Sequence, residues 1–181
     1  MQFSDKILRL AEEAEIELRS IFEELDRVSF KNTAKIMDAF REHKVSDVMF
    51  NPTSGYGYDD KGRDTLDMIW ADVMGAEKAF VRHNIVNGTH ALTIAMFGLL
   101  RPGDTMISVA GKPYDTLEQV IGIAGNEGDG SLKDFGINYE QIELKDGVLD
   151  LEAIEKSITS PEKKVKVVWV QRSKGYLNRR T

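Results

Sequence analysis

Apolar runs with the length of β-strands alternate with helix-like stretches in the second half of this chain, and this alternation restricts the fold more than any other feature. The strand-like runs cover residues 80–86, 105–109, 137–144 and 165–170. Helical patterns lie between them, at residues 89–100, 115–121 and 151–158. The run 165–170 is almost wholly apolar, which is typical of a strand covered on both faces of a parallel sheet. The sequence therefore predicts an α/β domain with a mostly parallel sheet and flanking helices.

The first 48 residues have helical rather than strand-like periodicity. Between residues 4 and 28, apolar side chains recur at alternating spacings of four and three, as in a helix packed against another helix. They are Ile7, Ala11, Ala14, Leu18, Ile21 and Leu25. A second, short helix is expected to start at the N-cap Asn32. We predict a helical arm over residues 1–48, which packs either on a partner subunit or on its own α/β domain of residues 49–181.

Charge and composition exclude several classes of function. The 181 residues carry a formal net charge of −6, which gives no general electrostatic support for nucleic-acid binding. The chain has no cysteine, so thiolate catalysis and zinc–cysteine sites are excluded, and its three scattered histidines predict no metal site. It lacks a run of about 18 apolar residues, so no membrane span is predicted. We expect a cytoplasmic protein whose partners are neither membranes nor nucleic acids.

Two loops concentrate side chains that can bind ligands. In residues 87–92, Gly88 and Thr89 lie between a predicted strand and a predicted helix, where backbone N–H groups and a hydroxyl can hold an anion such as phosphate. A strand–helix junction without a ligand gives the same pattern. Residues 50–64 combine two tyrosines with an arginine and several acids. A helix over residues 65–74 follows, which Asp64 is expected to cap and Gly75 to end.

Four motifs occur in a fixed order, at residues 55–66, 71–77, 87–92 and 111–117. Together with residues 171–176, they resemble the aluminium-resistance proteins, relatives of methionine γ-lyase and cystathionine β-lyase. These relatives are fold-type I enzymes that use pyridoxal 5′-phosphate (PLP). The resemblance covers nearly the whole chain. It implies the N-terminal portion of a fold-type I PLP-dependent transferase-like large domain, which follows the helical arm and is apparently truncated.

The resemblance implies cofactor roles for four residues. Gly88, Thr89 and His90 would hold the PLP phosphate at a helix N-terminus, and Tyr114 would cover one face of the pyridine ring. For two of these residues the pattern leaves another role open. Tyr114 could fill a gap between a helix and the sheet, and His90 could be an interior histidine with satisfied hydrogen bonds.

Three further residues are implied at a subunit interface. Tyr56, Tyr58 and Arg63 lie where related lyases send a tyrosine and an arginine into the neighbouring subunit's phosphate site. The resemblance therefore implies a homodimer or a homotetramer. Arg63 could instead pair with nearby acids on the protein's own surface.

The C-terminal segment contributes substrate contacts by the same resemblance. Arg172 or Ser173 would reach the carboxylate of an amino-acid substrate or the edge of the cofactor. Trp169, which lies just before this segment, and Trp70 are expected in the core instead.

The activity that the resemblance implies is that of a PLP-dependent carbon–sulfur lyase, which eliminates a β- or γ-substituent from sulfur-containing amino acids. Such an enzyme needs a lysine that forms a Schiff base and an acid beside the pyridine nitrogen. In the family both follow the point that corresponds to Thr181, so this chain is predicted to hold no catalytic residue and to be inactive alone. Two alternatives stay open. One is another fold-type I enzyme, such as an aminotransferase, aldolase or decarboxylase, and the other is a non-catalytic fragment that serves as an interaction module.

Overall fold

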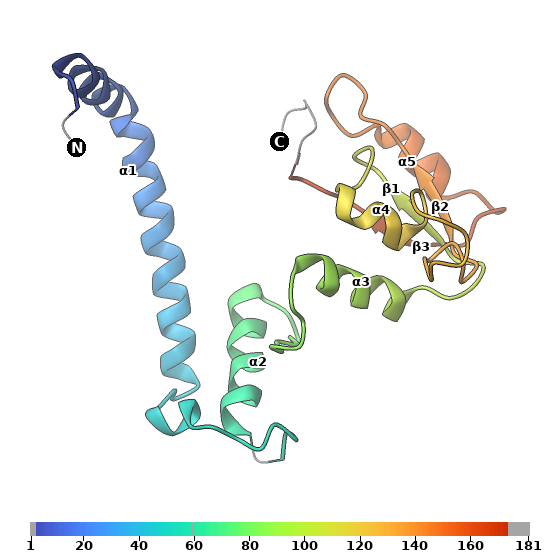
Figure 1. Ribbon diagram of the computed structural model, residues 1–181, viewed down its shortest axis with the longest axis horizontal. Coiled ribbons are helices and arrows are strands. Elements are labelled where there is room, and N and C mark those ends of the chain that lie inside the picture. Colours follow the sequence, from blue (N-terminus) through green and yellow to red (C-terminus); the bar gives the residue numbers. More distant parts are fainter. Residues whose placement is uncertain (1–2, 59, 174–181) are drawn as a thin grey trace. The chain divides into compact units, whose positions relative to one another are not determined.

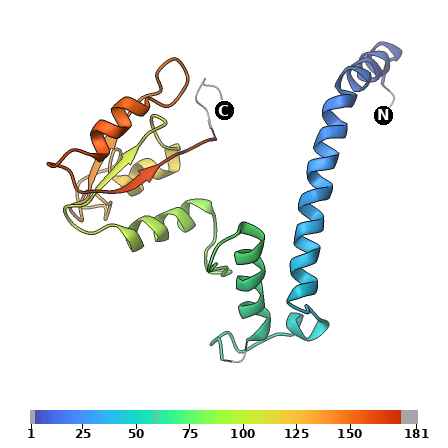
Figure 2. The same cartoon turned by 180° about the vertical axis from the view of Figure 1, so that it is seen from behind.

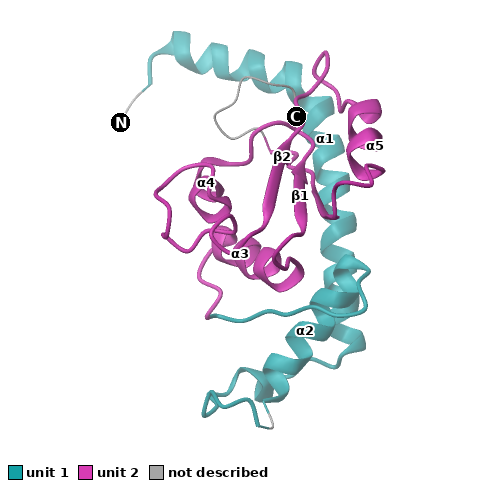
Figure 3. Ribbon diagram, turned by 90° about the vertical axis from the view of Figure 1, so that its right-hand side faces the viewer, with its two compact units in different colours: residues 1–83 teal, residues 84–181 magenta. Residues whose placement is uncertain are grey.

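The structure is a computed structural model that describes residues 3–58 and 60–173 of the chain. The chain divides into two compact units, residues 1–83 and residues 84–181, which Figure 3 colours separately. The domain boundary expected between residues 48 and 49 falls inside the first unit and stays a prediction.

The described part of the first unit is helical. Its elements are α1 (Asp5–Glu42), the short 3-10 helix η1 (Asp47–Phe50) and α2 (Lys61–Met74). α1 is one continuous helix, so the prediction of a second helix starting at Asn32 was wrong. The helix continues because residues 28–36 contain neither glycine nor proline, and an asparagine inside a helix costs less than about 0.7 kcal/mol relative to alanine.

α2 packs on the C-terminal part of α1 and on η1 (Figure 1). Ala39 is buried in this part of α1. Just beyond α1, His43 Nε2 lies 2.5 Å from the carboxylate of Asp72, which belongs to α2. Trp70, also on α2, is exposed, so the prediction of a core position was wrong. α2 buries the face that carries Thr65 and Ile69. Trp70 follows Ile69 and therefore lies about 100° round the helix, outside this face.

The two ends of α2 are set by residues close in sequence. The Asp60 carboxylate accepts the N–H of Arg63 at 3.0 Å, so α2 begins one turn earlier than predicted. The prediction that Asp64 caps α2 was wrong, because this residue lies inside the first turn of the helix. At the other end the prediction is confirmed, since Gly75 ends the helix in the left-handed conformation with φ of 66°.

The second unit is a three-stranded parallel sheet with flanking helices (Figures 1 and 2). Its elements, in chain order, are α3 (Gly88–Leu99), β1 (Thr105–Ser108), α4 (Asp115–Ile121), β2 (Asn138–Gln141), α5 (Leu151–Ile158) and β3 (Val165–Trp169). The strand order is β2-β1-β3, and Thr105 of β1 aligns with Asn138 of β2 and Val165 of β3. The central strand is therefore hydrogen-bonded on both sides.

The sheet has an apolar core on each face, because successive residues of β1 point to opposite sides. Met106 packs with apolar residues of α3 and α4. Ile107, its neighbour, packs on the other face with Val109 and Ile142, and Ile154 of α5 lies against this second core. Both Met106 and Ile107 are fully buried. The predicted arrangement of helices over a parallel sheet is confirmed for this unit.

One predicted strand, over residues 80–86, is absent from the described structure, and that prediction was wrong. A strand needs a neighbouring strand to satisfy its backbone groups. The N–H of Val81 instead donates to the Asp67 side chain at 2.8 Å. The apolar run is therefore left as a loop between α2 and α3. The strand predicted over 137–144 is present but shorter.

Candidate functional site

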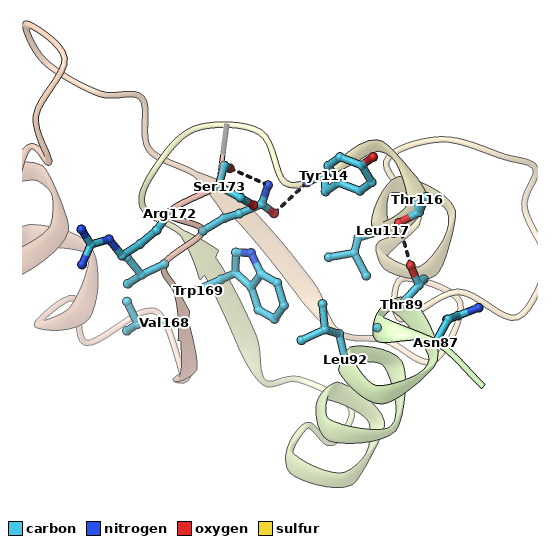
Figure 4. Close-up of a pocket in the computed structure, with 13 residues that line it drawn as sticks. Asn87, Thr89, Leu92, Tyr114, Thr116, Leu117, Val168, Trp169, Arg172 and Ser173 are labelled. Atoms are coloured by element: carbon cyan, nitrogen blue, oxygen red, sulfur yellow. Dashed lines mark hydrogen bonds between the residues drawn. The ribbon is translucent and has the colours of Figure 1, made fainter. Parts of the chain in front are cut away.

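A pocket of about 660 Å³ lies in the second unit (Figure 4). It is formed by the N-terminal end of α3, the start of α4 and the C-terminal end of β3. Residues 87–89, 92, 114, 116, 117 and 168–173 supply its lining. β1 and β3 run parallel, so the segments that leave their carboxyl ends emerge at the same edge of the sheet. The first of these segments leads to α4 and the second carries residues 170–173. This topology brings together side chains more than fifty positions apart in sequence.

The first turn of α3 forms the polar end of the pocket. Asn87 caps the helix, because its side-chain oxygen accepts the N–H of His90 at 2.8 Å. Gly88 and Thr89 follow, and the helix itself offers no acceptor to their N–H groups. A Cβ built on Gly88 would meet no atom within 4 Å, so the backbone here faces open space. The Thr89 hydroxyl lies 2.8 Å from that of Thr116, which ties the start of α3 to α4.

His90 lies in the same turn but outside the pocket lining. Its Nδ1 accepts the backbone N–H of Val86 at 3.4 Å. The backbone N–H of His90 donates to the Asn87 side chain. His90 is half-buried, and these contacts hold it to its own turn. The cofactor role of His90 stays a prediction.

Apolar and aromatic side chains form the walls of the pocket. Leu117 is buried and Trp169 half-buried, and Figure 4 shows both side chains turned toward the cavity below the Tyr114 ring. Trp169 also packs against the core under α3 and α4, as predicted. Its buried indole nitrogen has no hydrogen-bond partner among the residues that the structure describes. Sequence reasoning assigned Trp169 to the core and missed its place in the pocket.

Gln171 is a second pocket residue that sequence reasoning missed. Its side-chain oxygen accepts the backbone N–H of Tyr114 at 2.9 Å, and its amide nitrogen donates to the Ser173 carbonyl at 3.2 Å. Arg172, by contrast, extends its guanidinium away from Tyr114 (Figure 4). Neighbouring residues in an extended segment point to opposite sides. The same alternation, counted from Trp169, could have indicated that the side chain of residue 171 lies on the Trp169 side of the segment. Arg172 and Ser173, which the sequence indicated, also belong to the lining of the pocket.

Hydrogen bonds and an ion pair fix the loop before Tyr114. The Ser108 hydroxyl donates to the carbonyl of Gly111 at 2.6 Å. Gly111 has φ of +77°, and a Cβ there would lie 2.9 Å from the Glu143 carboxylate, so a side chain would be strained. Lys112 pairs with Glu118 of α4 at 2.9 Å. These contacts fix the backbone that leads into Tyr114.

Tyr56, Tyr58 and Arg63 belong to the first unit and form no pocket lining with the residues above. Both tyrosines are exposed, by 83% and 86%. The Arg63 guanidinium donates to the Gly57 carbonyl at 2.9 Å and pairs with Asp64 at 3.1 Å. The surface pairing that the sequence left open for Arg63 is therefore present. The predicted role of the three residues at a neighbouring subunit stays a prediction.

Two other features, a metal site and a membrane-spanning helix, are absent from residues 3–58 and 60–173. No group of three or more histidine or acidic side chains in these ranges could hold a metal ion. The helices of the same ranges include none that is long and apolar enough to cross a membrane.

Comparisons with known proteins give matches over nearly the whole chain. A family model described as methionine gamma-lyase matches residues 7–181. A carbon-sulfur lyase involved in aluminum resistance from Clostridium novyi NT has a TM-score of 0.89 and 48% identity, over 94% of this chain and 41% of its own. A proposed cystathionine beta-lyase involved in aluminum resistance from Clostridium acetobutylicum has a TM-score of 0.91 and 41% identity, over 97% of this chain and 42% of its own.

A sequence relative gives the same coverage. The uncharacterized protein YnbB of Bacillus subtilis (strain 168) is 49% identical over 172 residues, which are 94% of this chain and 40% of YnbB. The chain therefore spans about two fifths of the length of these relatives. The resemblance to the aluminium-resistance proteins, predicted from four motifs, is confirmed.

Proposed function

This chain belongs to the methionine γ-lyase family, and we propose on that premise that the whole protein is a PLP-dependent carbon–sulfur lyase acting on sulfur-containing amino acids. One observation carries the proposal. The pocket joins a helix N-terminus, suited to a phosphate, to an aromatic wall suited to a flat ring. The description of the Clostridium novyi relative as a carbon-sulfur lyase supports the reaction class.

The residues present fit PLP by their chemistry. Its phosphate needs donors and positive potential, which the N–H groups of Gly88 and Thr89 and the end of α3 supply. The lining contains no acidic side chain that would repel the phosphate. Tyr114 and Trp169 offer aromatic surface to the cofactor ring. We therefore assign the phosphate to the first turn of α3 and the ring to the wall formed by these two residues.

Within this pocket each residue has a separate task. Bound PLP supplies an electron sink for negative charge at the amino-acid Cα. Thr89 holds the phosphate through its hydroxyl, while Leu117 and Trp169 exclude water from the ring. Gln171 holds the backbone of Tyr114, and so keeps that ring at the pocket wall. The proton-transferring lysine and the acid beside the pyridine nitrogen are assigned to the part of the relatives' length that this chain does not span.

The exposed loop of the first unit fits a role in a homo-oligomer. Tyr56 and Tyr58 present their rings and hydroxyls to solvent, and Asp60 anchors the loop to α2 and to Thr53. A tyrosine held in this way is available to a phosphate site of another subunit. We propose that the working enzyme is a homodimer or homotetramer that takes a small amino acid as substrate.

Cofactor binding by the pocket is tested on the 181-residue chain by titration with PLP, followed by Trp169 and Trp70 fluorescence. Thr89→Val removes one phosphate donor, which is worth about 1 kcal/mol, so the dissociation constant should rise about five- to tenfold. The matched control is Thr159→Val, because the Thr159 hydroxyl bonds only its own helix at Glu155. Equal affinity of the two variants would show that the Thr89 hydroxyl does not hold the phosphate.

The reaction is tested on the whole protein. We expect release of ammonia and a keto acid from a sulfur-containing amino acid. Formation of pyridoxamine phosphate would instead identify an aminotransferase, and release of carbon dioxide a decarboxylase. A whole protein that holds no PLP and turns over no sulfur amino acid would refute the lyase proposal.

A further inference from the structure

The straight part of α1 exposes a continuous apolar face, which we call the seam. It consists of Leu18, Ile21, Leu25 and Val28, which lie at alternating spacings of three and four and are exposed by 38–57%. The first turns of α1 bend away from this part (Figures 1 and 3). A row of large apolar side chains left in water marks a docking surface. We propose that the seam docks in antiparallel orientation against α1 of a second copy of this chain.

The charges along α1 indicate a second copy as the occupant. Residues 5–26 carry eight acidic and three basic side chains, whereas residues 27–42 carry two acidic and four basic ones. An antiparallel pair places the acidic half of each helix beside the basic half of the other. A parallel pair in register places acidic half beside acidic half. Since like charges across a helix pair repel, the antiparallel pair is favoured.

A pair centred near residue 23 satisfies both the apolar and the charge pattern. Leu18 then meets Val28 of the second copy, and Ile21 meets Leu25 of the second copy. Beside these apolar layers, Glu17 lies next to Lys31 of the second copy, twice by symmetry. Glu24 meets its own symmetry mate at the centre, which opposes the pair. The register thus predicts two attractive charge contacts and one repulsive one.

The seam also continues a face that is already used for packing. Ala39 follows Val28 at eleven residues, or about three turns, and is buried in the part of α1 that α2 covers. N-terminal to the contact with α2, the same side of α1 is exposed within the first unit. A second α1 would therefore extend an existing helix–helix contact and does not depend on PLP or on the lyase proposal.

Self-association of the 181-residue chain is measured by sedimentation equilibrium from 1 to 100 µM. We expect a monomer–dimer equilibrium in which Ile21→Asp raises the dissociation constant at least about a hundredfold, because each dimer would bury two unpaired charges. The matched control is Ile16→Asp, since Ile16 is 61% exposed and lies on the opposite side of α1. It should change the constant less than about threefold. Circular dichroism checks that α1 stays helical in both variants. A monomer at every concentration, or equal effects of the two variants, would overturn the proposal.

Charge reversal tests the orientation. Glu17→Lys and Lys31→Glu should each weaken self-association about tenfold, because two attractive contacts become repulsive. An equimolar mixture of these two variants should form heterodimers as tightly as the unchanged chain, since both contacts are then attractive, one with its native signs and one with reversed signs. Glu24→Gln should tighten the dimer by removing the central repulsion. Failure of the mixture to recover would rule out the antiparallel register, and tight heterodimers without a response to Ile21→Asp would rule out the seam.

Discussion

The two units differ in what happens to the same kind of apolar residue. In the second unit, Met106 and Ile107 are fully buried, one on each face of the sheet. In the first unit, Ile21 and Leu25 follow an equally regular pattern and are exposed by 53% and 57%. The periodicity is a property of the chain in both cases. Burial depends on whether a complementary surface is present within the same unit.

The candidate site residues differ in the same way. Tyr114 is tied by Gln171 and sits on a loop whose backbone is hydrogen-bonded from below. Tyr56 and Tyr58 lie on a loop in solvent. The residues that line the pocket therefore all belong to one unit, whereas the two tyrosines of the other loop are exposed in theirs. Five predictions, each comparing two variants, test how far this difference extends.

The largest expected difference is between two leucines. Leu117→Ala should lower the free energy of unfolding of the second unit by about 2–5 kcal/mol, because it leaves a cavity beside Trp169 and Ile121. Leu25→Ala should change the unfolding of the first unit by less than about 1 kcal/mol in dilute solution, where the seam is uncovered. Urea denaturation below 1 µM measures both. A large loss in Leu25→Ala would mean that the seam is already covered within the monomer.

Packing inside the first unit is tested at a glycine. A Cβ at Gly62 would lie 2.2 Å from the Met49 carbonyl oxygen, so Gly62→Ala should separate α2 from η1 and cost about 1–3 kcal/mol. The control, Gly98→Ala in α3, meets no atom within 4 Å and should stabilise the protein by about 0.5–1 kcal/mol. Thermal unfolding of the two variants should shift in opposite directions. Shifts in the same direction would contradict this account of the α2–η1 contact.

In the pocket, Gln171→Leu removes the acceptor of the Tyr114 N–H. We expect the dissociation constant for PLP to rise about fivefold, since a lost hydrogen bond is worth about 1 kcal/mol. Arg172→Leu is the comparison, because its guanidinium points away from Tyr114. It should leave PLP affinity within about twofold. If Arg172→Leu has the larger effect, the assignment of Gln171 as the residue that positions Tyr114 is wrong.

The loop before β2 should give the second unit a pH-dependent stability. N–H groups of Gly128, Ser131 and Gly130 donate to the Asp134 carboxylate, and these bonds lower its pKa from 3.8 to about 2. Because the pKa is lower in the folded state, this contribution is full above about pH 4 and is lost as the pH falls toward 2.

Asp134→Asn should therefore lose stability at pH 6 and show a flatter dependence between pH 4 and pH 2. Chemical denaturation at pH 6, 4 and 2 measures the effect. Glu127→Gln changes the charge equally in the same loop and serves as the control. An unchanged slope in Asp134→Asn would show that another group causes the acid sensitivity.

The smallest effect is expected in the exposed loop of the first unit. Tyr56→Phe and Tyr58→Phe each remove one hydroxyl from a solvated side chain, so the free energy of unfolding of the 181-residue chain should change by less than about 0.5 kcal/mol. In the whole protein the same variants should weaken PLP binding if the loop serves a neighbouring subunit. Unchanged PLP affinity in both variants would remove the tyrosines from the cofactor site.

Local elements of the second unit were predictable because each depends on residues close together. α4 and α5 have the predicted bounds, 115–121 and 151–158, and the strands β1 and β3 start where expected. Residues 101–104 make a turn into β1, in which Gly103 has φ of +86° and the Asp104 side chain accepts the N–H of Arg101. The loop over 80–86 was not predictable in this way, since its strand-like composition says nothing about a partner strand.

For the site, the sequence indicated Gly88, Thr89, Tyr114, Arg172 and Ser173, and the lining of one pocket contains all five. The sequence did not predict Gln171 as a site residue, because a glutamine has no distinctive chemistry until its contacts are known. Its hydrogen bond to Tyr114 joins residues 57 positions apart. Such a contact depends on the parallel pairing of β1 and β3, which no local pattern contains.

The sequence alone determined the family, the apolar periodicity and the helix ends of the second unit to within one residue, because caps such as Asn87 and Asp150 act on N–H groups three residues away. Tertiary structure decided which apolar runs became strands, which side of residues 169–173 faces the pocket and which part of α1 stays uncovered. The physical reason is the range of the interactions. Capping and helical hydrogen bonds close within one turn, whereas strand pairing, burial and pocket formation need a second surface that is distant in the chain.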